Sequence, residues 1–474
     1  MFFMRKHAII YGQLHSGVQK KAVELLSQFL LDYTHAYPVC LQYEPGADHS
    51  AYRCFYIGTK HNNGFIAENA DPQLAGTEAY SISVKNDTVI IEGFDDAGVL
   101  YGCVDFYNQY IIRFEYAHAE DWHSANYYWR NIFEKPLPDF ACSSAPSVRN
   151  RGIWTWGHVI YDYRGFIDHM VKLKLNTIII WNDFAPVNAK EIIEYAHRSA
   201  VKVIWGFSWG WDDGCSKLSL RNLGDQSQDI FRKFKEEYGS LDVDGIYFQS
   251  ITELETEYLE GILVAAAVTE FVNSTARLFF NTCPDLELQF GLHATSVKNR
   301  LEFIKKVDPR IRIVWEDCGS FPFSYFTHTV DGFAETKAFS ENIANLRGVG
   351  DRFGVVLKGM TKLDWPSFAH LDGPISLGTS SDAVKADRIN RKSRDWKYFQ
   401  AYWMANGNKA LEMIRTLAEC KQGDLHITAL VEDGMFEENI MYPVALYSEM
   451  LWNCNADFSK LLSEVALRSY VTFA

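Results

Sequence analysis

The chain has 474 residues, of which 47% are hydrophobic and 15% aromatic, so it is long enough to bury a large core and to form more than one domain. Its 46 lysines and arginines are outnumbered by 60 aspartates and glutamates, which gives a net charge of −14. No basic run stands out, so binding to nucleic acid or to an anionic membrane is not expected. This composition also excludes a disordered chain and a coiled coil.

The nine cysteines are scattered and form no C-x-x-C pair, which favours reduced thiols over a zinc site or a redox dithiol. At the N-terminus the apolar residues precede the basic pair, the reverse of the order in a signal peptide. No apolar run reaches transmembrane length. We therefore expect a soluble cytoplasmic protein. No cofactor is expected, and the sequence leaves the oligomeric state open.

Residues 1–120 have the pattern of a small α+β domain. A strand over 7–13 is followed by a helix over 16–35, and a second strand follows at 54–60. Within 80–112, two strands of alternating apolar and polar residues flank an Asn-Asp turn, and a helix follows them. Residues 121–147 are rich in aromatic, proline and serine residues without a clear period, and we interpret them as a linker.

From residue 148 to 474 the pattern changes to a regular alternation of strand, loop and helix. Such alternation indicates parallel strands joined by right-handed crossovers. No glycine-rich phosphate loop follows the first strand, so a (β/α)₈ TIM barrel is favoured over an open doubly wound sheet. The eight predicted strands are 151–158, 176–183, 201–211, 243–250, 286–295, 311–319, 352–365 and 425–434.

In a TIM barrel the catalytic residues lie at the C-terminal ends of the strands. Glu253 follows the fourth strand and is the first candidate for the general acid, although a glutamate there also suits the N-terminus of a following helix. Glu316 and Asp317 end the sixth strand and are the candidates for a second carboxylate. The remaining residues at or near strand ends are candidate substrate contacts: Trp154, Trp156, His158, Asn182, Asp183, Trp209, Trp211, Tyr247, Glu255, His293, Trp315, Lys358 and Trp365.

This set is dominated by indole rings, carboxylates and amides. Indole rings suit the C–H faces of a pyranose ring, while carboxylates and amides bind its hydroxyl groups, so the set predicts a carbohydrate substrate. Any single tryptophan is equally consistent with barrel core. The first strand offers His158 alone rather than a His-x-His pair, and His293 stands alone on the fifth, so no metal site is expected.

Two stretches carry a resemblance to known enzymes. The segment YSISVKNDTVIIEGFDDAGVLYGCVDF resembles the small N-terminal α/β domain that precedes the barrel in family 20 β-N-acetylhexosaminidases and family 67 α-glucuronidases. GIWTWGH, together with MVKLKLNTIIIWNDFAPVNAKEIIEYAHRSAVKVIWGFSWG, resembles the opening of their barrels. The resemblance covers most of the chain, with few identical residues. It implies a small domain followed by a catalytic TIM barrel and a glycosidase activity.

The resemblance also indicates roles for some residues. In family 20 an Asp-Glu pair ends the fourth strand, where this chain has Thr252-Glu253, so Glu253 matches the acid and the acetamido-orienting Asp is absent. In the α-glucuronidases later carboxylates activate water, a role that Glu316 or Asp317 fits. We expect a glycoside hydrolase acting on an N-acetylhexosaminide or a related sugar.

The sequence leaves alternatives to this activity open, and it also gives two expectations about the acids. The alternatives to this activity are an inverting enzyme of the α-glucuronidase type and a barrel that binds carbohydrate without catalysis. The missing Asp and the distance of two strands between the acids favour a wide carboxylate gap and inversion. Burial among aromatic rings is expected to raise the pKa of Glu253.

Overall fold

The computed structural model describes residues 6–110, 136–156, 160–181, 185–209, 219–316, 332–360, 381–421, 424–431 and 435–474. The chain divides into two compact units. The first contains Met1–Pro146, His197–Ala200 and Ser463–Tyr470, and the second contains Ser147–Ala196, Val201–Leu462 and Val471–Ala474.

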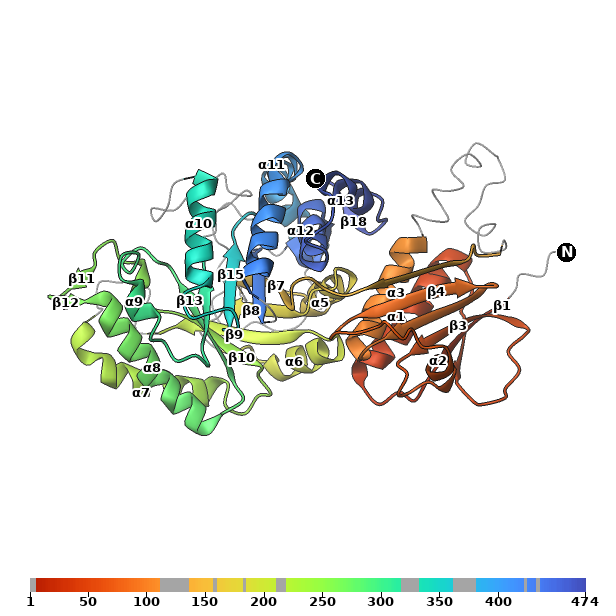
Figure 1. Ribbon diagram of the computed structural model, residues 1–474, viewed down its shortest axis with the longest axis horizontal. Coiled ribbons are helices and arrows are strands. Elements are labelled where there is room, and N and C mark those ends of the chain that lie inside the picture. The colour runs from red at the N-terminus through yellow and green to blue at the C-terminus, as the bar shows by residue number, and fades with distance from the viewer. Residues whose placement is uncertain are drawn as a thin grey trace. The chain divides into compact units, whose positions relative to one another are not determined.

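The first unit contains a six-stranded sheet (Figure 1). Its strand order is β2-β1-β3-β5-β4-β6, with β4 antiparallel to both of its neighbours and the other pairs parallel. The strands are β1 (Lys6–Tyr11), β2 (Val39–Gln42), β3 (Tyr52–Gly58), β4 (Tyr80–Lys85), β5 (Thr88–Gly93) and β6 (Phe140–Ser144).

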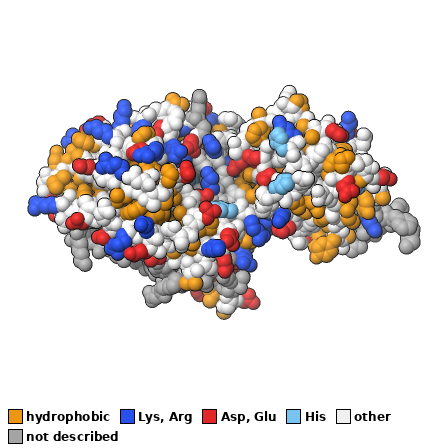
Figure 2. Space-filling model, turned by 90° about the horizontal axis from the view of Figure 1, so that it is seen from below, with side chains coloured by type: hydrophobic (Ala, Val, Ile, Leu, Met, Phe, Trp, Pro, Cys, Tyr) orange, Lys and Arg blue, Asp and Glu red, His pale blue; other side chains and the backbone are white. Residues whose placement is uncertain are grey.

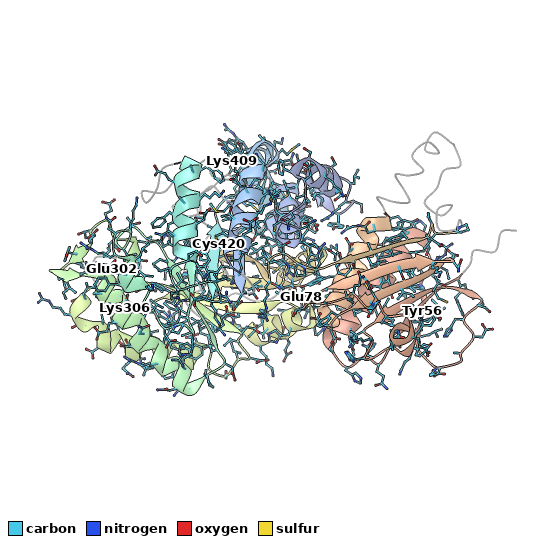
Figure 3. The ribbon with its side chains drawn as sticks, in the orientation of Figure 1. Tyr56, Glu78, Glu302, Lys306, Lys409 and Cys420 are labelled. Atoms are coloured by element: carbon cyan, nitrogen blue, oxygen red, sulfur yellow. The ribbon has the colours of Figure 1, made fainter. Side chains whose placement is uncertain are left out.

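Local sequence signals explain these elements. Asn86 and Asp87 both adopt positive φ, of 49° and 64°, as a tight two-residue hairpin turn requires. Helix α1 (Gly17–Thr34) begins with a capping box in which Ser16 and Gln19 satisfy each other's backbone N–H groups. Helix α1 packs against α3 (Asp96–Tyr110). At α2 (Gly64–Asn69), Phe65 stacks on Tyr56 of β3 with ring centroids 3.6 Å apart. Tyr56 is labelled on this sheet in Figure 3.

The second unit is a closed barrel of eight parallel strands, which confirms the predicted TIM-barrel class. Each strand pairs in parallel with the next, and β16 closes the barrel by pairing with β7. The eight strands are β7 (Asn150–Trp156), β8 (Thr177–Trp181), β9 (Lys202–Ser208), β10 (Gly245–Gln249), β13 (Glu287–Leu292), β14 (Arg312–Trp315), β15 (Phe353–Leu357) and β16 (Leu425–Leu430).

Helices follow the barrel strands along the chain, as crossover connections in a parallel barrel require. They carry apolar stripes that are buried, such as Ile192, Ile193 and Ala196. The helices are α5 (Tyr163–Lys172), α6 (Ala189–Arg198), α7 (Leu223–Glu237), α8 (Val264–Thr282), α9 (Leu301–Ile304), α10 (Gly332–Ala344), α11 (Asp382–Cys420), α12 (Tyr442–Trp452) and α13 (Phe458–Ala466). Short 3-10 turns lie at η5 (Leu220–Asn222), η6 (Ile251–Glu253) and η8 (Met435–Glu437), and a strand pair joins β17 (Ile440–Met441) to β18 (Val471–Thr472).

Two segments fold differently from the sequence interpretation in ways that bear on the domain boundary and the site. Part of the predicted linker, residues 140–144, is strand β6 of the first sheet. The helix expected after the fourth strand does not follow Glu253 directly but begins at Val264, because a small hairpin, β11 (Tyr258–Leu259) and β12 (Ile262–Leu263), precedes it. Its turn residues Glu260 and Gly261 have φ of 53° and 77°.

Surface charge is mixed on the face shown in Figure 2, where basic and acidic side chains are interspersed. Among the helices of the described ranges, none combines the length and the apolar character that a membrane crossing requires.

Candidate active site

Three ionisable side chains emerge at neighbouring C-terminal strand ends of the barrel. Glu253 lies in η6, immediately after β10, while His293 and Glu316 directly follow β13 and β14. The backbone N–H of Glu316 donates to the Leu292 carbonyl, which extends the β13–β14 pairing beyond the last assigned residues. Parallel strands that end at the same edge thus bring the three side chains together.

The imidazole of His293 bridges the two glutamates. Its Nε2 lies 2.6 Å from Oε2 of Glu316 and 2.8 Å from Oε1 of Glu253. Both distances are those of charge-assisted hydrogen bonds. The backbone that carries Glu253 is fixed from the next loop, because the N–H and the hydroxyl of Ser296 each donate to the Thr252 carbonyl at 3.1 Å.

Glu316 is buried, with 3% of the residue exposed, and besides its contact with His293 it accepts hydrogen bonds from two side chains. Tyr247 donates its hydroxyl to Oε1, and Gln249 donates from Nε2 to both oxygens, at 2.9 and 2.7 Å. Burial acts to raise the pKa of Glu316, but the charge and hydrogen bond of His293, the charge of Lys358 and the Tyr247 hydrogen bond outweigh it and lower the pKa. Glu316 is therefore held as a carboxylate.

A glycine makes room for this arrangement. A Cβ atom at Gly291 would collide with Oε1 of Glu316 and with the hydroxyl of Tyr247. Gly291 and His293 are two residues apart and therefore share the inner face of β13, as Tyr247 and Gln249 share the inner face of β10. The sequence prediction included Tyr247 and His293 but missed Gln249 and Gly291, both of which alternation from the predicted residues would have found.

Alternation also decides the orientation at the end of β14. Val314 belongs to an inner cluster of the barrel, and Glu316, two residues on, faces inward too. Trp315 faces the opposite way, is 0% exposed, and donates its indole N–H to Ser340 of α10. The expectation that Trp315 contacts substrate is therefore wrong, because its ring lies between the barrel and a helix.

Trp209 requires the same correction. It is 0% exposed and stacks on Phe248 at 3.6 Å and on Phe279 of α8 at 5.2 Å, between ring centroids. Phe248 alternates with the inward-facing Tyr247, so this stack lies outside the barrel strands. Trp154, in contrast, belongs to the inner cluster and lies 6.0 Å from the Tyr247 ring. It is 3% exposed, so it supports Tyr247 from within the barrel.

The environment of Glu253 differs from the expected one. Its side chain is 48% exposed, so it is not buried among aromatic rings as the sequence suggests. Glu255, two residues on, is exposed. Because Oε1 of Glu253 and Oε2 of Glu316 contact one nitrogen at 2.8 and 2.6 Å, these two oxygens are at most about 5.4 Å apart, no wider than the ~5–5.5 Å carboxyl spacing of retaining glycosidases. The nearest oxygens of this pair are therefore closer than the ~6.5–9.5 Å gap that the sequence favours.

Of the remaining predicted site residues, Lys358 lies directly after β15, and its charge acts on Glu316. Several others lie partly or wholly outside the described residues. For Trp156 only the backbone is described. The others that lie outside the described residues are His158, Asn182, Asp183, Trp211, Asp317 and Trp365.

A cleft of about 490 Å³ opens at the other end of the barrel. Lys202, Asp244 and Glu287, at the N-terminal strand ends, line it together with Arg352. It is thus separate from the glutamates at the C-terminal ends. Within the part of the chain that the structure describes, no group of three or more His, Cys, Asp or Glu side chains is arranged to hold a metal ion.

Comparison with known proteins finds similar structures but no similar sequences. No family profile matches the sequence, and no curated protein matches it. Solved structures do match. A β-N-acetylhexosaminidase from Bacteroides fragilis NCTC 9343 is 12% identical, with a TM-score of 0.57 over 99% of this chain and 92% of that one. The chain shares its fold with glycoside hydrolases.

Two further glycoside hydrolases are similar. A family GH115 4-O-methyl-α-glucuronidase with specificity for decorated arabinogalactans is 14% identical, with a TM-score of 0.54 over 94% of this chain. A family GH138 enzyme targeting pectin rhamnogalacturonan II is 12% identical, with a TM-score of 0.53 over 96%. The chain spans 56% and 65% of the lengths of these two proteins. These likenesses support a glycoside hydrolase fold without selecting family 20 or family 67.

Proposed function

We propose that this protein is a glycoside hydrolase in which Glu253 is the general acid and Glu316 the assisting carboxylate. The observation that carries the proposal is the pair itself: a half-exposed and a buried glutamate share one imidazole nitrogen at the C-terminal end of a TIM barrel. A glycosidase needs two carboxyl groups in different environments, one to protonate the leaving oxygen and one that stays ionised.

In this proposal each carboxyl group has one role. Glu253, the more exposed, donates a proton to the glycosidic oxygen as the bond to the anomeric carbon breaks and the bonding electrons go to that oxygen. Glu316, kept ionised by its donors, stabilises the positive charge that develops on the sugar ring. A water molecule then forms the new bond to the anomeric carbon and returns a proton to Glu253, which completes the hydrolysis. The short separation of the nearest oxygens favours retention of the anomeric configuration, which NMR of the first-formed product would detect.

The sugar is the finer part of the proposal. The hexosaminidase neighbour, matched over 92% of its own length, favours an N-acetylhexosaminide. Thr252 is fully buried where the family 20 enzymes carry an acetamido-orienting Asp, which instead favours a related sugar, such as a uronide, bound without that contact. A barrel that binds carbohydrate without cleaving it is the remaining alternative.

A panel of aryl glycosides tests the activity. We expect hydrolysis of at least one N-acetylhexosaminide or hexuronide by the wild-type protein, and its loss in the double variant E253Q/E316Q. If no member of the panel is cleaved while isothermal titration detects sugar binding, the binding-barrel alternative is supported instead. Hydrolysis that survives in the double variant would place the chemistry elsewhere in the chain.

A further inference from the structure

Within the described residues, three polar side-chain atoms lie near Nε2 of His293, which has only one position for a proton. They are Oε2 of Glu316 at 2.6 Å, Oε1 of Glu253 at 2.8 Å and Nε2 of Gln249 at 3.3 Å. An ionised carboxylate can only accept hydrogen bonds, and a histidine nitrogen either donates or accepts according to its tautomer. The hydrogen-bonding character of the neighbours therefore determines whether Nε2 carries a proton.

Glu316 requires a donor at this position. It already accepts from Tyr247 and, at both oxygens, from Gln249, and it is held as a carboxylate. A nitrogen lone pair facing a carboxylate oxygen at 2.6 Å would be repelled, so Nε2 must carry a proton. The Gln249 amide is itself a donor whose hydrogens are directed at Glu316, so it does not compete for this role.

The same N–H then also meets Glu253. Since Nε2 is protonated, Oε1 of Glu253 is an acceptor at 2.8 Å and cannot be the oxygen that carries a transferable proton. The other oxygen, Oε2, remains for that proton, on a side chain that is 48% exposed. The bridge thus distinguishes the two oxygens of one carboxyl group.

We propose that His293 is a positioning residue, whose Nε2–H, held by Glu316, anchors Oε1 of Glu253 and leaves Oε2 to present the proton to the leaving group. This inference rests on the proposed glycosidase function. In this role His293 does not contact the sugar. Loss of the bridge should let the Glu253 side chain rotate, and misplacement of a catalytic group by about 1 Å costs on the order of 100-fold in rate.

Kinetics of two variants test the positioning role. H293L removes the donor, whereas H293Q keeps an N–H group near the place of Nε2. We expect H293L to lose about 10–100-fold in kcat on glycosides with poor leaving groups, to lose little on activated aryl glycosides and to keep its KM. H293Q should recover most of the loss. Equal losses on both substrate classes, or an H293Q variant as slow as H293L, would overturn the inference.

A second measurement does not depend on activity. In the full-length protein labelled with ¹⁵N-histidine, the His293 signal, assigned from its absence in H293Q, should show a protonated Nε2 that shifts in E253Q. An unprotonated Nε2 would overturn the arrangement. A wild-type protein that cleaves no glycoside would refute the proposed function and with it the catalytic consequence, while the NMR signal still decides whether Nε2 carries the proton that contacts Glu253.

Discussion

The two ends of the barrel contain charged clusters built on the same two strands, and they are completed in opposite ways. At the C-terminal end, His293, which follows β13, contacts both Glu316, which follows β14, and the half-exposed Glu253. At the N-terminal end, Arg312 at the start of β14 pairs with Glu287 of β13 at 2.7 Å and with Asp424 at 3.0 Å. The first cluster ends at the half-exposed Glu253, and in the second the cation Arg312 is buried between two carboxylates.

The N-terminal cluster of Arg312, Glu287 and Asp424 has further interactions within the protein. Arg312 also donates to the carbonyls of Phe353 and Asp424. Burial acts to raise the pKa of Glu287, but the charges of Arg312, His426 and Lys202 outweigh it and lower the pKa to about 2. The charges of Arg312, Glu287 and Asp424 are paired with one another at the N-terminal strand ends, so we assign this end to stability and the C-terminal end to chemistry.

The largest expected effect is on rate. Replacing Glu253 by Gln should lower kcat/KM on natural glycosides by about two to four orders of magnitude, because the proton donor is lost. E255Q, two residues on and exposed, is the matched control and should keep near wild-type activity. Thermal unfolding should be nearly unchanged in both, since neither side chain is buried. An E255Q variant as slow as E253Q would remove the distinction between the two acids.

Disrupting the N-terminal cluster should lower stability and leave the rate unchanged. R312M leaves Glu287 and Asp424 without their shared cation and should cost about 3–5 kcal/mol of unfolding free energy, measured by urea denaturation. R310M is the control, because Arg310 is exposed and pairs with Asp308 on the surface. Folded R312M should retain the kcat of the wild type. A large loss of kcat with unchanged stability would contradict the assignment of this end.

Gly291 allows a smaller test at the C-terminal end. G291A should cost about 1–3 kcal/mol of stability and also lower activity, because the added methyl group displaces Glu316 and Tyr247. The control is G350A, since a Cβ at Gly350 meets nothing within 4 Å. Wild-type kinetics and stability in G291A would show that the packing around Glu316 is looser than the structure indicates.

A further effect is a dependence of stability on pH. Burial, with the charge of Arg312, lowers the pKa of His426 from 6.5 to about 3. Between these values the unfolded chain binds a proton that the folded chain does not, so stability is complete above about pH 6.5 and falls as the pH drops towards 3. H426Q should flatten this dependence by up to about 1.4 kcal/mol per pH unit, measured by urea denaturation from pH 6.5 to 4. Equal slopes in H426Q and wild type would exclude a buried neutral His426.

The barrel was predictable because its strands and helices alternate along the chain, and that pattern depends on local residues. The hairpin before α8 was not, because its turn at Glu260 and Gly261 interrupts a stretch that otherwise has helical character. Alternation would have placed Gln249 beside Tyr247. It could not distinguish Trp209 from a substrate contact, because a tryptophan at a strand end suits core and pocket equally.

The bridge at His293 could not be found from sequence. It depends on the register of β13 against β14, in which the N–H of Glu316 meets the Leu292 carbonyl. A slip of one residue would turn Glu316 outward and Trp315 inward. Register in a barrel is set by strand stagger around the whole closed sheet, which no single segment encodes.

The central claim is that Glu253 donates the proton to the leaving group. Its most direct test compares wild type and E253Q over a series of aryl glycosides whose leaving groups span a range of pKa. We expect the rate of E253Q to fall steeply as the leaving-group pKa rises, while that of the wild type changes little, so that the two approach each other only for the most acidic leaving groups. Parallel dependences, with the same loss at every leaving group, would contradict the claim.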